Sequence, residues 1–172
     1  QVTLEPELQP SFTLSKGEWR EFSTSESFEL NATGPVLLGH YLQGSNYPGF
    51  SPVCGTTGIG DPAFALGVPV QQYLKEYIVL TPPGYQENFI NIIHPKNTLT
   101  EVAIDGQSVY EFKPPTLNPL GVGTGDYAVL QLPVETGVHT ISAQVAIGVT
   151  AYGYDCDVSY AYPGGLSLKT LA

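Results

Sequence analysis

Short runs in which apolar and polar residues alternate occur along most of the chain. The runs are rich in Val, Ile, Tyr, Phe and Thr, and residues typical of turns separate them. They lie at 19–22, 36–42, 77–80, 89–93, 102–104, 127–132, 139–145, 149–154 and 158–162. A series of short strands separated by turns is typical of antiparallel β-structure. The pattern therefore predicts an all-β fold, a single antiparallel β-sandwich of jelly-roll-like character.

Gly and Pro divide the chain between these runs. Residues 1–16 are polar and contain two prolines, which predicts a linker or edge segment ahead of a β-sandwich domain at 17–172. Residues 43–67 form a long Gly- and Pro-rich loop, and loops of that length in compact domains are usually functional or held in place. Residues 68–75 are expected to form one or two helical turns, and Asp105-Gly106 predicts a tight hairpin turn.

The charge of the chain excludes several classes of partner. Sixteen acidic residues against six basic ones give a net charge of -10 at pH 7. A phosphate backbone or an anionic lipid surface would be repelled, so we expect no nucleic-acid partner. No run of 18 apolar residues occurs, so no membrane insertion is expected, and any signal peptide is expected to have been removed before Gln1. The acidity serves solubility or attracts a cationic partner, and both interpretations stay open.

The two cysteines, Cys54 and Cys156, are expected to form a disulfide. A chain with few charges, many Tyr and Thr, and no Met suits an extracellular location, where paired cysteines are usually oxidised. The bridge would close a loop of roughly 100 residues, worth about 4–5 kcal/mol in the chain-entropy model. Two buried free thiols are the alternative.

Asp61, Asp155 and Asp157 are candidate calcium ligands. Each stands beside a Gly-rich loop or in a turn, and Ca²⁺ takes several oxygen ligands from such segments. A Cys54–Cys156 bridge would bring Asp61 towards the other two carboxylates. The alternative is that these residues stabilise turns by bonding their own backbone. No other cofactor is predicted, because the chain lacks a zinc motif, a phosphate-binding loop and a serine-hydrolase elbow.

Four tyrosines near the C-terminus form two pairs, Tyr152 with Tyr154 and Tyr160 with Tyr162. Spacing of two residues places the members of each pair on one face of a strand. Such rings either pack in a hairpin or form an aromatic platform for a ligand. We expect at least one ring of each pair to be buried.

From residue 60 onward, the order of short motifs resembles the IgGFc-binding protein N-terminal domain family. The motifs are G-D-P at 60–62, V-P-V-Q-Q-Y at 68–73, Y-I-V-L-T-P at 77–82, F-I-N-I-I at 89–93, V-A-I-D-G at 102–106, G-V-H-T-I at 137–141, G-V-T-A-Y-G-Y at 148–154 and S-Y-A-Y-P-G-G at 159–165. The resemblance implies a β-rich module of an extracellular or cell-surface protein. It supplies no binding residues that could be transferred to this sequence.

The expected function is therefore non-catalytic adhesion or recognition of an extracellular protein or glycan. The alternative is a structural spacer, or an oligomerising tip of a surface fibre without its own ligand, in which case the chain is a homo-oligomer. Asn46, Tyr47 and Phe50 in the long loop are the expected ligand contacts, because aromatic and amide groups suit sugar or protein surfaces. Equally, Phe50 would close the end of the sandwich beside the bridge. A glycosidase would need two carboxylates facing each other across a cleft, and the sequence shows no such pair.

Overall fold

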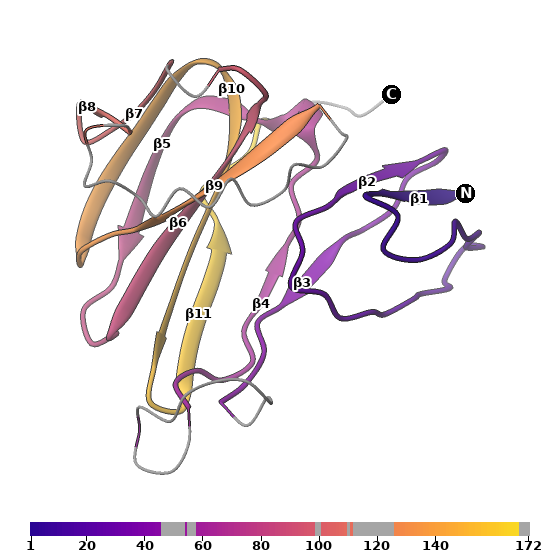
Figure 1. Cartoon of the computed structure of the whole chain (residues 1–172), viewed down its shortest axis with the longest axis horizontal. Coiled ribbons are helices and arrows are strands. Elements are labelled where there is room, and N and C mark those ends of the chain that lie inside the picture. The colour runs from indigo at the N-terminus through magenta and orange to yellow at the C-terminus, as the bar shows by residue number, and fades with distance from the viewer. Residues whose placement is uncertain (46–53, 55–57, 99–100, 110, 112–125, 169–172) are drawn as a thin grey trace.

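The computed structural model is built from antiparallel strands throughout, which confirms the predicted all-β sandwich (Figure 1). It describes residues 1–45, 54, 58–98, 101–109, 111 and 126–168. The strands are β1 (Val2–Glu5), β2 (Glu29–Ala32), β3 (Gly39–Tyr41), β4 (Phe64–Leu66), β5 (Leu74–Thr81), β6 (Glu87–Pro95), β7 (Val102–Ile104), β8 (Gln107–Ser108), β9 (Tyr127–Pro133), β10 (Gly137–Asp155) and β11 (Val158–Pro163). The jelly-roll-like character of the sandwich stays a prediction.

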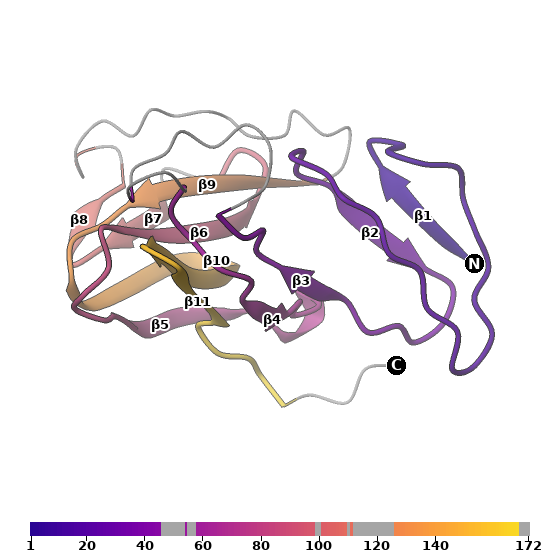
Figure 2. The ribbon, with the colours of Figure 1, turned by 90° about the horizontal axis from the view of Figure 1, so that it is seen from below.

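The 19-residue strand β10 joins the two halves of the sandwich. Its first half pairs with β5 and β7, and its second half pairs with β6 and β11. The register with β5 shifts between Ser142 and Ile147, and there the curled sheet passes from one layer to the other (Figure 2). Two separate strands were predicted here, which is wrong. Gly148 does not form a turn but lies within the strand. A Cβ at this position would lie 2.5 Å from the Tyr73 ring, so only glycine fits.

The core lies between the layers and follows the predicted alternation. In β6 every second residue is buried, and the exposed fraction of Ile90 and Ile92 is 0%. Ile104, Leu132, Ile141 and Ile147 from neighbouring strands complete the same cluster. Each large aliphatic side chain buried in this way contributes roughly 1.5–3 kcal/mol, so this cluster is the main source of stability.

Two local predictions are confirmed. Residues Val70–Gln72 form a single 3-10 turn within the expected helical segment. Asp105 and Gly106 form the two-residue turn between β7 and β8, with φ angles of 51° and 79°. Both positive angles are those of the tight hairpin turn that an Asp-Gly pair favours.

The N-terminal arm, residues 1–38, departs most from the prediction. It contains the two-stranded sheet of β1 and β2, while β3 pairs with β4 beside the sandwich (Figure 1). A strand predicted at 19–22 is wrong: the segment is not a strand, and Trp19 is 79% exposed. Strand β4 was not predicted. It lies within the predicted loop 43–67, so the loop is shorter than expected. The domain boundary after residue 16 stays a prediction, although β1 within that segment pairs with β2.

Candidate functional site

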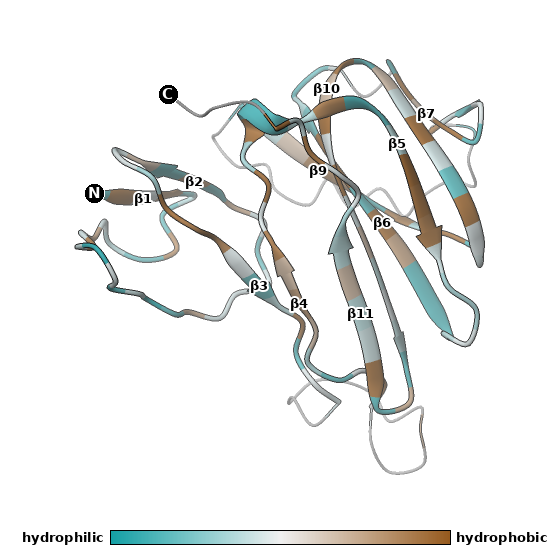
Figure 3. Ribbon diagram, turned by 180° about the vertical axis from the view of Figure 1, so that it is seen from behind, coloured by the Kyte–Doolittle hydropathy of each residue, from teal (hydrophilic) through white to brown (hydrophobic). Residues whose placement is uncertain are grey.

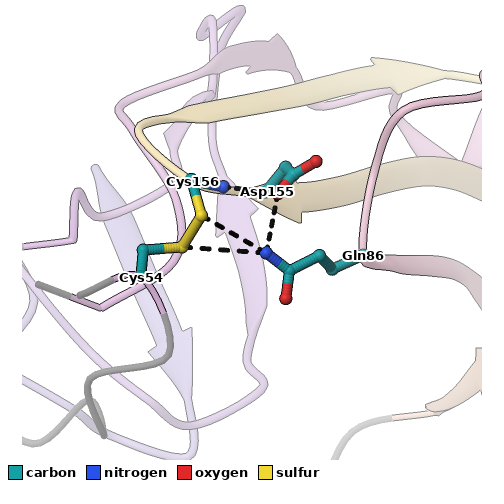
Figure 4. Close-up of a disulfide and its surroundings, with 4 residues drawn as sticks. All are labelled: Cys54, Gln86, Asp155 and Cys156. Carbon is teal, nitrogen blue, oxygen red and sulfur yellow. Dashed lines mark hydrogen bonds between the residues drawn. A yellow bond between two sulfur atoms is a disulfide. The ribbon is translucent and has the colours of Figure 1, made fainter.

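The predicted disulfide is confirmed at one end of the sandwich, where β10 turns into β11. Cys54 and Cys156 are bonded, with their Cα atoms 5.5 Å apart (Figure 4). Cys54 comes from the long loop, and Cys156 stands in the turn between the two strands. The bridge therefore ties the middle of that loop to the most extensively paired strand of the fold.

Gln86 stands against this bridge and was missed by the sequence analysis. Its Nε2 donates to Asp155 Oδ1 at 2.8 Å and lies 3.4 Å and 3.7 Å from the sulfurs of Cys156 and Cys54 (Figure 4). Asp155 Oδ1 also accepts from the Cys156 backbone N–H at 2.7 Å. One carboxylate oxygen thus fixes both the turn and the side chain that covers the disulfide.

Backbone hydrogen bonds hold the two ends of the loop beside the bridge. The Ser45 N–H donates to the Gly60 carbonyl at 3.0 Å, and the Gly60 N–H donates to the Asp155 carbonyl at 2.8 Å. Ile59 forms an antiparallel bridge with Cys156. The predicted contacts Asn46, Tyr47 and Phe50 lie between these anchors, outside the described residues.

The three candidate calcium ligands lie around the same turn in different roles. Asp155 uses its carboxylate as just described, Asp157 adopts a φ of 52° in the turn, and the Asp61 N–H donates to Ser159 Oγ at 2.9 Å. Among the described residues, the one cluster of metal-type ligands is Cys54, Asp155 and Cys156, whose sulfurs are already joined to each other. Calcium binding by Asp61, Asp155 and Asp157 stays a prediction.

The first tyrosine pair has one buried ring, as expected, and this ring is Tyr152. Tyr152 is 6% exposed and stacks on Phe89 with ring centroids 5.3 Å apart. Its hydroxyl donates to Asn91 Oδ1 at 3.2 Å and accepts from Gln131. Burial raises the pKa of Tyr152 to about 12. Tyr152 is therefore a packing residue rather than part of an exposed platform.

The second pair is only half-buried, so the expectation of one buried ring is wrong there. The reason is position: both rings pack against the margin of the core cluster rather than within it. Tyr160 covers Gly153, where a Cβ would lie 2.5 Å from its ring, and its hydroxyl donates to Asn88 Oδ1 at 2.7 Å. Tyr162 reaches across to β5, where its hydroxyl donates to the Leu80 carbonyl at 2.5 Å and accepts from the Leu80 N–H at 2.8 Å.

A shallow apolar groove of about 490 Å³ lies where these rings meet β5. Its lining is Ile78, Val79, Leu80, Pro82, Tyr160 and Tyr162. Ile78 is 73% exposed and Leu80 is 52% exposed, and the neighbouring Val138 of β10 is 65% exposed. Figure 3 shows hydrophobic residues along β5, beside β10. Exposed apolar residues gathered in one place are typical of an interaction surface.

His139 has a structural position. Its Nδ1 lies 2.8 Å from Asp105 Oδ2 and its Nε2 lies 2.9 Å from the Glu135 carbonyl, so protein oxygens occupy both ring nitrogens. Burial opposes ionisation of Asp105, but hydrogen bonds from His139 and from the Thr140 backbone outweigh it and lower the pKa of the Asp105 carboxyl. The pair fastens the β7–β8 hairpin to β10 and leaves neither nitrogen of His139 for a substrate.

The fold is a disulfide-linked β-sandwich with an exposed apolar edge. The comparison with family models identifies the family: the IgGFc binding protein model matches residues 1–153, and the chain belongs to that family. The match includes the N-terminal arm, which the motif resemblance did not reach. Neither the curated proteins nor the solved structures gave a match. Among the described residues, no helix is long and apolar enough to cross a membrane.

Proposed function

We propose that this chain is a non-catalytic adhesion or recognition module of a cell-surface or secreted protein. The observation that carries the proposal is the anchored loop at the disulfide end, in a chain that belongs to the IgGFc binding protein family. Sandwich folds commonly bind through end loops, because the sheets form a rigid support on which loop residues vary freely.

The anchors reduce the cost of binding through this loop. A long free loop loses conformational entropy when a partner orders it. Here the ends are joined by the Ser45–Gly60 hydrogen bond, and Cys54 is fixed within the loop by its bridge. Links at the ends of a loop and within it generally reduce the entropy lost when a partner orders the loop, which favours affinity.

Within this proposal, Tyr47 and Phe50 contribute aromatic contacts and Asn46 contributes polar specificity. Aromatic residues supply large contact area with few rotatable bonds, which is why they are enriched in binding hot spots. The net charge of -10 favours a partner with a basic surface. The partner is an extracellular protein or glycan, and the family description makes immunoglobulin Fc the first protein to test.

The test combines ligand retention with a measurement of size. The immobilised chain is exposed to immunoglobulin Fc and to a glycan array, and its mass in solution is measured by light scattering. Specific retention by the monomeric chain supports recognition. A stable oligomer that retains neither probe contradicts it and favours a spacer or tip domain.

A further inference from the structure

Strand β5 has an unpaired edge. Within the described part of the chain, β5 pairs with β10 alone. In an antiparallel ladder, every second residue points its N–H and C=O away from the partner strand. Thr140 lies opposite Ile78, yet its N–H donates to Asp105 Oδ1 and its carbonyl accepts from the Asp105 N–H, both on the far side of β10. Ile78 therefore directs its own backbone groups outwards, away from β10.

Leu80 confirms this alternation independently. Its N–H and C=O both bind the Tyr162 hydroxyl, which comes from the other layer of the sandwich. Tyr162 thus occupies one backbone pair of the edge in the way that a residue of an added strand would. Ile78 lies two residues before Leu80, and Glu76 lies two residues before Ile78. By the same alternation, the backbone groups of both residues face the unpaired edge of β5.

We propose that this edge binds an extended segment of the protein partner, which adds to the sheet as a strand antiparallel to β5. Main-chain hydrogen bonds to Ile78 and Glu76 supply affinity, and alternate side chains supply specificity. The Tyr162 hydroxyl, already bonded to Leu80, stops the added strand and sets its register. The inference rests on the proposed function only in taking the natural partner to be a protein.

The side chains on this edge define the chemistry of the segment. Glu76, Ile78 and Leu80 share the exposed face of β5, where Ile78 is 73% exposed. Residues directly opposite each other in an antiparallel pair contact one another. The partner strand therefore carries an apolar residue opposite Ile78 and, two residues later, a basic residue opposite Glu76.

A second copy of the chain fits this edge less well. If two copies paired with Ile78 opposite Ile78, Glu76 of each copy would lie opposite Leu80 of the other. The backbone groups of Leu80 are already bonded to Tyr162. Self-pairing centred on Tyr77 would set Glu76 of each copy against Ile78 of the other. Neither register gives the Glu76 carboxylate an opposite charge, whereas a basic residue of a partner strand does.

The test uses the synthetic peptide acetyl-Ser-Thr-Ile-Thr-Lys-Thr-amide, in which Ile is designed to face Ile78 and Lys to face Glu76. Binding is followed by amide NMR and hydrogen exchange. We expect the Ile78 amide to exchange rapidly in the free protein and slowly with peptide, while the Tyr77 and Val79 amides are protected throughout. An Ile78 amide that is protected in the free protein as well as those of Tyr77 and Val79 would overturn the proposal.

Backbone methylation of the peptide separates strand addition from simple apolar contact. N-methylation of its Ile and Lys amides, which would face β5, should weaken binding by roughly tenfold or more. N-methylation of the two Thr residues that follow them, whose amides face away, is the matched control and should change little. Equal binding by both methylated peptides, or no binding by the parent peptide up to about 1 mM, would contradict strand addition.

Charge exchange tests the register. Glu76→Lys should weaken the Lys peptide and strengthen a peptide with Glu in its place, whereas Lys75→Glu, on the neighbouring position, should not reverse this preference. An unchanged preference in Glu76→Lys would contradict the assigned register. The peptide does not use the long loop. If the peptide does not bind but Fc or a glycan is still retained, only the proposed edge site is contradicted. Peptide binding without retention of either probe would instead count against the proposed function.

Discussion

The sandwich and the N-terminal arm differ in how they bury apolar residues. In the sandwich, side chains from five strands meet in one cluster, and Ile90, Ile92 and Ile147 are 0% exposed. In the arm, Val2 and Leu4 are buried outside that cluster, while Trp19 and Leu37 are each 79% exposed. The sandwich therefore has one large apolar cluster, whereas the arm has buried apolar residues outside that cluster and leaves large side chains exposed.

This difference shows what a period-two pattern predicts. Alternation indicates burial when one face of the strand packs against a core, as it does in β6, where every second residue is buried. The arm strands are short and lie in a two-stranded sheet, which is marginal on its own. The arm nevertheless lies within the range that the family model matches.

The largest expected effect falls on the bridge that holds the sandwich end. Replacing both Cys54 and Cys156 by Ser should lower the free energy of unfolding by about 4–5 kcal/mol, because the open chain gains entropy when unfolded. Denaturant unfolding of the oxidised protein and the double variant measures the difference. Equal stability of the two proteins would show that the bridge adds nothing to the fold.

Core truncation contrasts the two regions directly. Ile92→Ala removes a fully buried side chain and should cost about 2–5 kcal/mol. Leu37→Ala, at an arm position that is 79% exposed, should change stability by less than about 0.5 kcal/mol. Denaturant midpoints of the two variants provide the test, and similar losses would mean that the arm packs as tightly as the sandwich.

Glycine replacement tests the contact between β10 and β11. In Gly153→Ala, the new Cβ would lie 2.5 Å from the Tyr160 ring and 2.7 Å from the Glu87 carbonyl oxygen, so the backbone must move. We expect a loss of about 1–3 kcal/mol. Gly34→Ala in the arm has nothing within 4 Å and is the matched control. A Gly153→Ala variant with the melting temperature of the control would contradict the assigned packing.

The smallest expected effect is the pH dependence of stability that the Asp105 carboxyl causes in acid. The folded state holds the pKa of the Asp105 carboxyl below its ordinary value of 3.8, so ionised Asp105 stabilises the fold above that value. This contribution is lost as the pH falls through the lowered pKa. Asp105→Asn should therefore be less stable than the parent at pH 7, with a gap that narrows in strong acid. A gap that is independent of pH in urea titrations would remove the assigned role of the His139 contact.

The sequence was sufficient for what local patterns decide. Neighbouring residues are enough to predict the strands at 89–93 and 127–132 and the Asp105-Gly106 turn. The disulfide could be predicted because two cysteines allow only one pairing. Contacts set by the fold could not be predicted. Gln86 reaches Asp155 across 69 positions, and nothing in its own neighbourhood marks it.

The edge of β5 illustrates the same limit. The run at 77–80 correctly predicts a strand, but alternation alone does not show that one side stays unpaired or that Tyr162 binds the Leu80 backbone. Likewise, the Ala-Ile-Gly stretch at 146–148 reads as a break between strands. It continues β10 because Tyr73 packs against Gly148 and fills the space that a side chain would need.

The most direct test of the proposed recognition function is the double variant Tyr47→Ser with Phe50→Ser. The probe is immunoglobulin Fc, or whichever glycan the array retains, with Trp19→Ser in the exposed arm as the control. We predict a loss of binding of roughly tenfold or more in the double variant alone, with all melting temperatures within about 2 °C of one another. Full binding by the double variant would show that Tyr47 and Phe50 do not contact the partner, and a large fall in its melting temperature would show that the loop is structural. Either result would contradict the proposed recognition function.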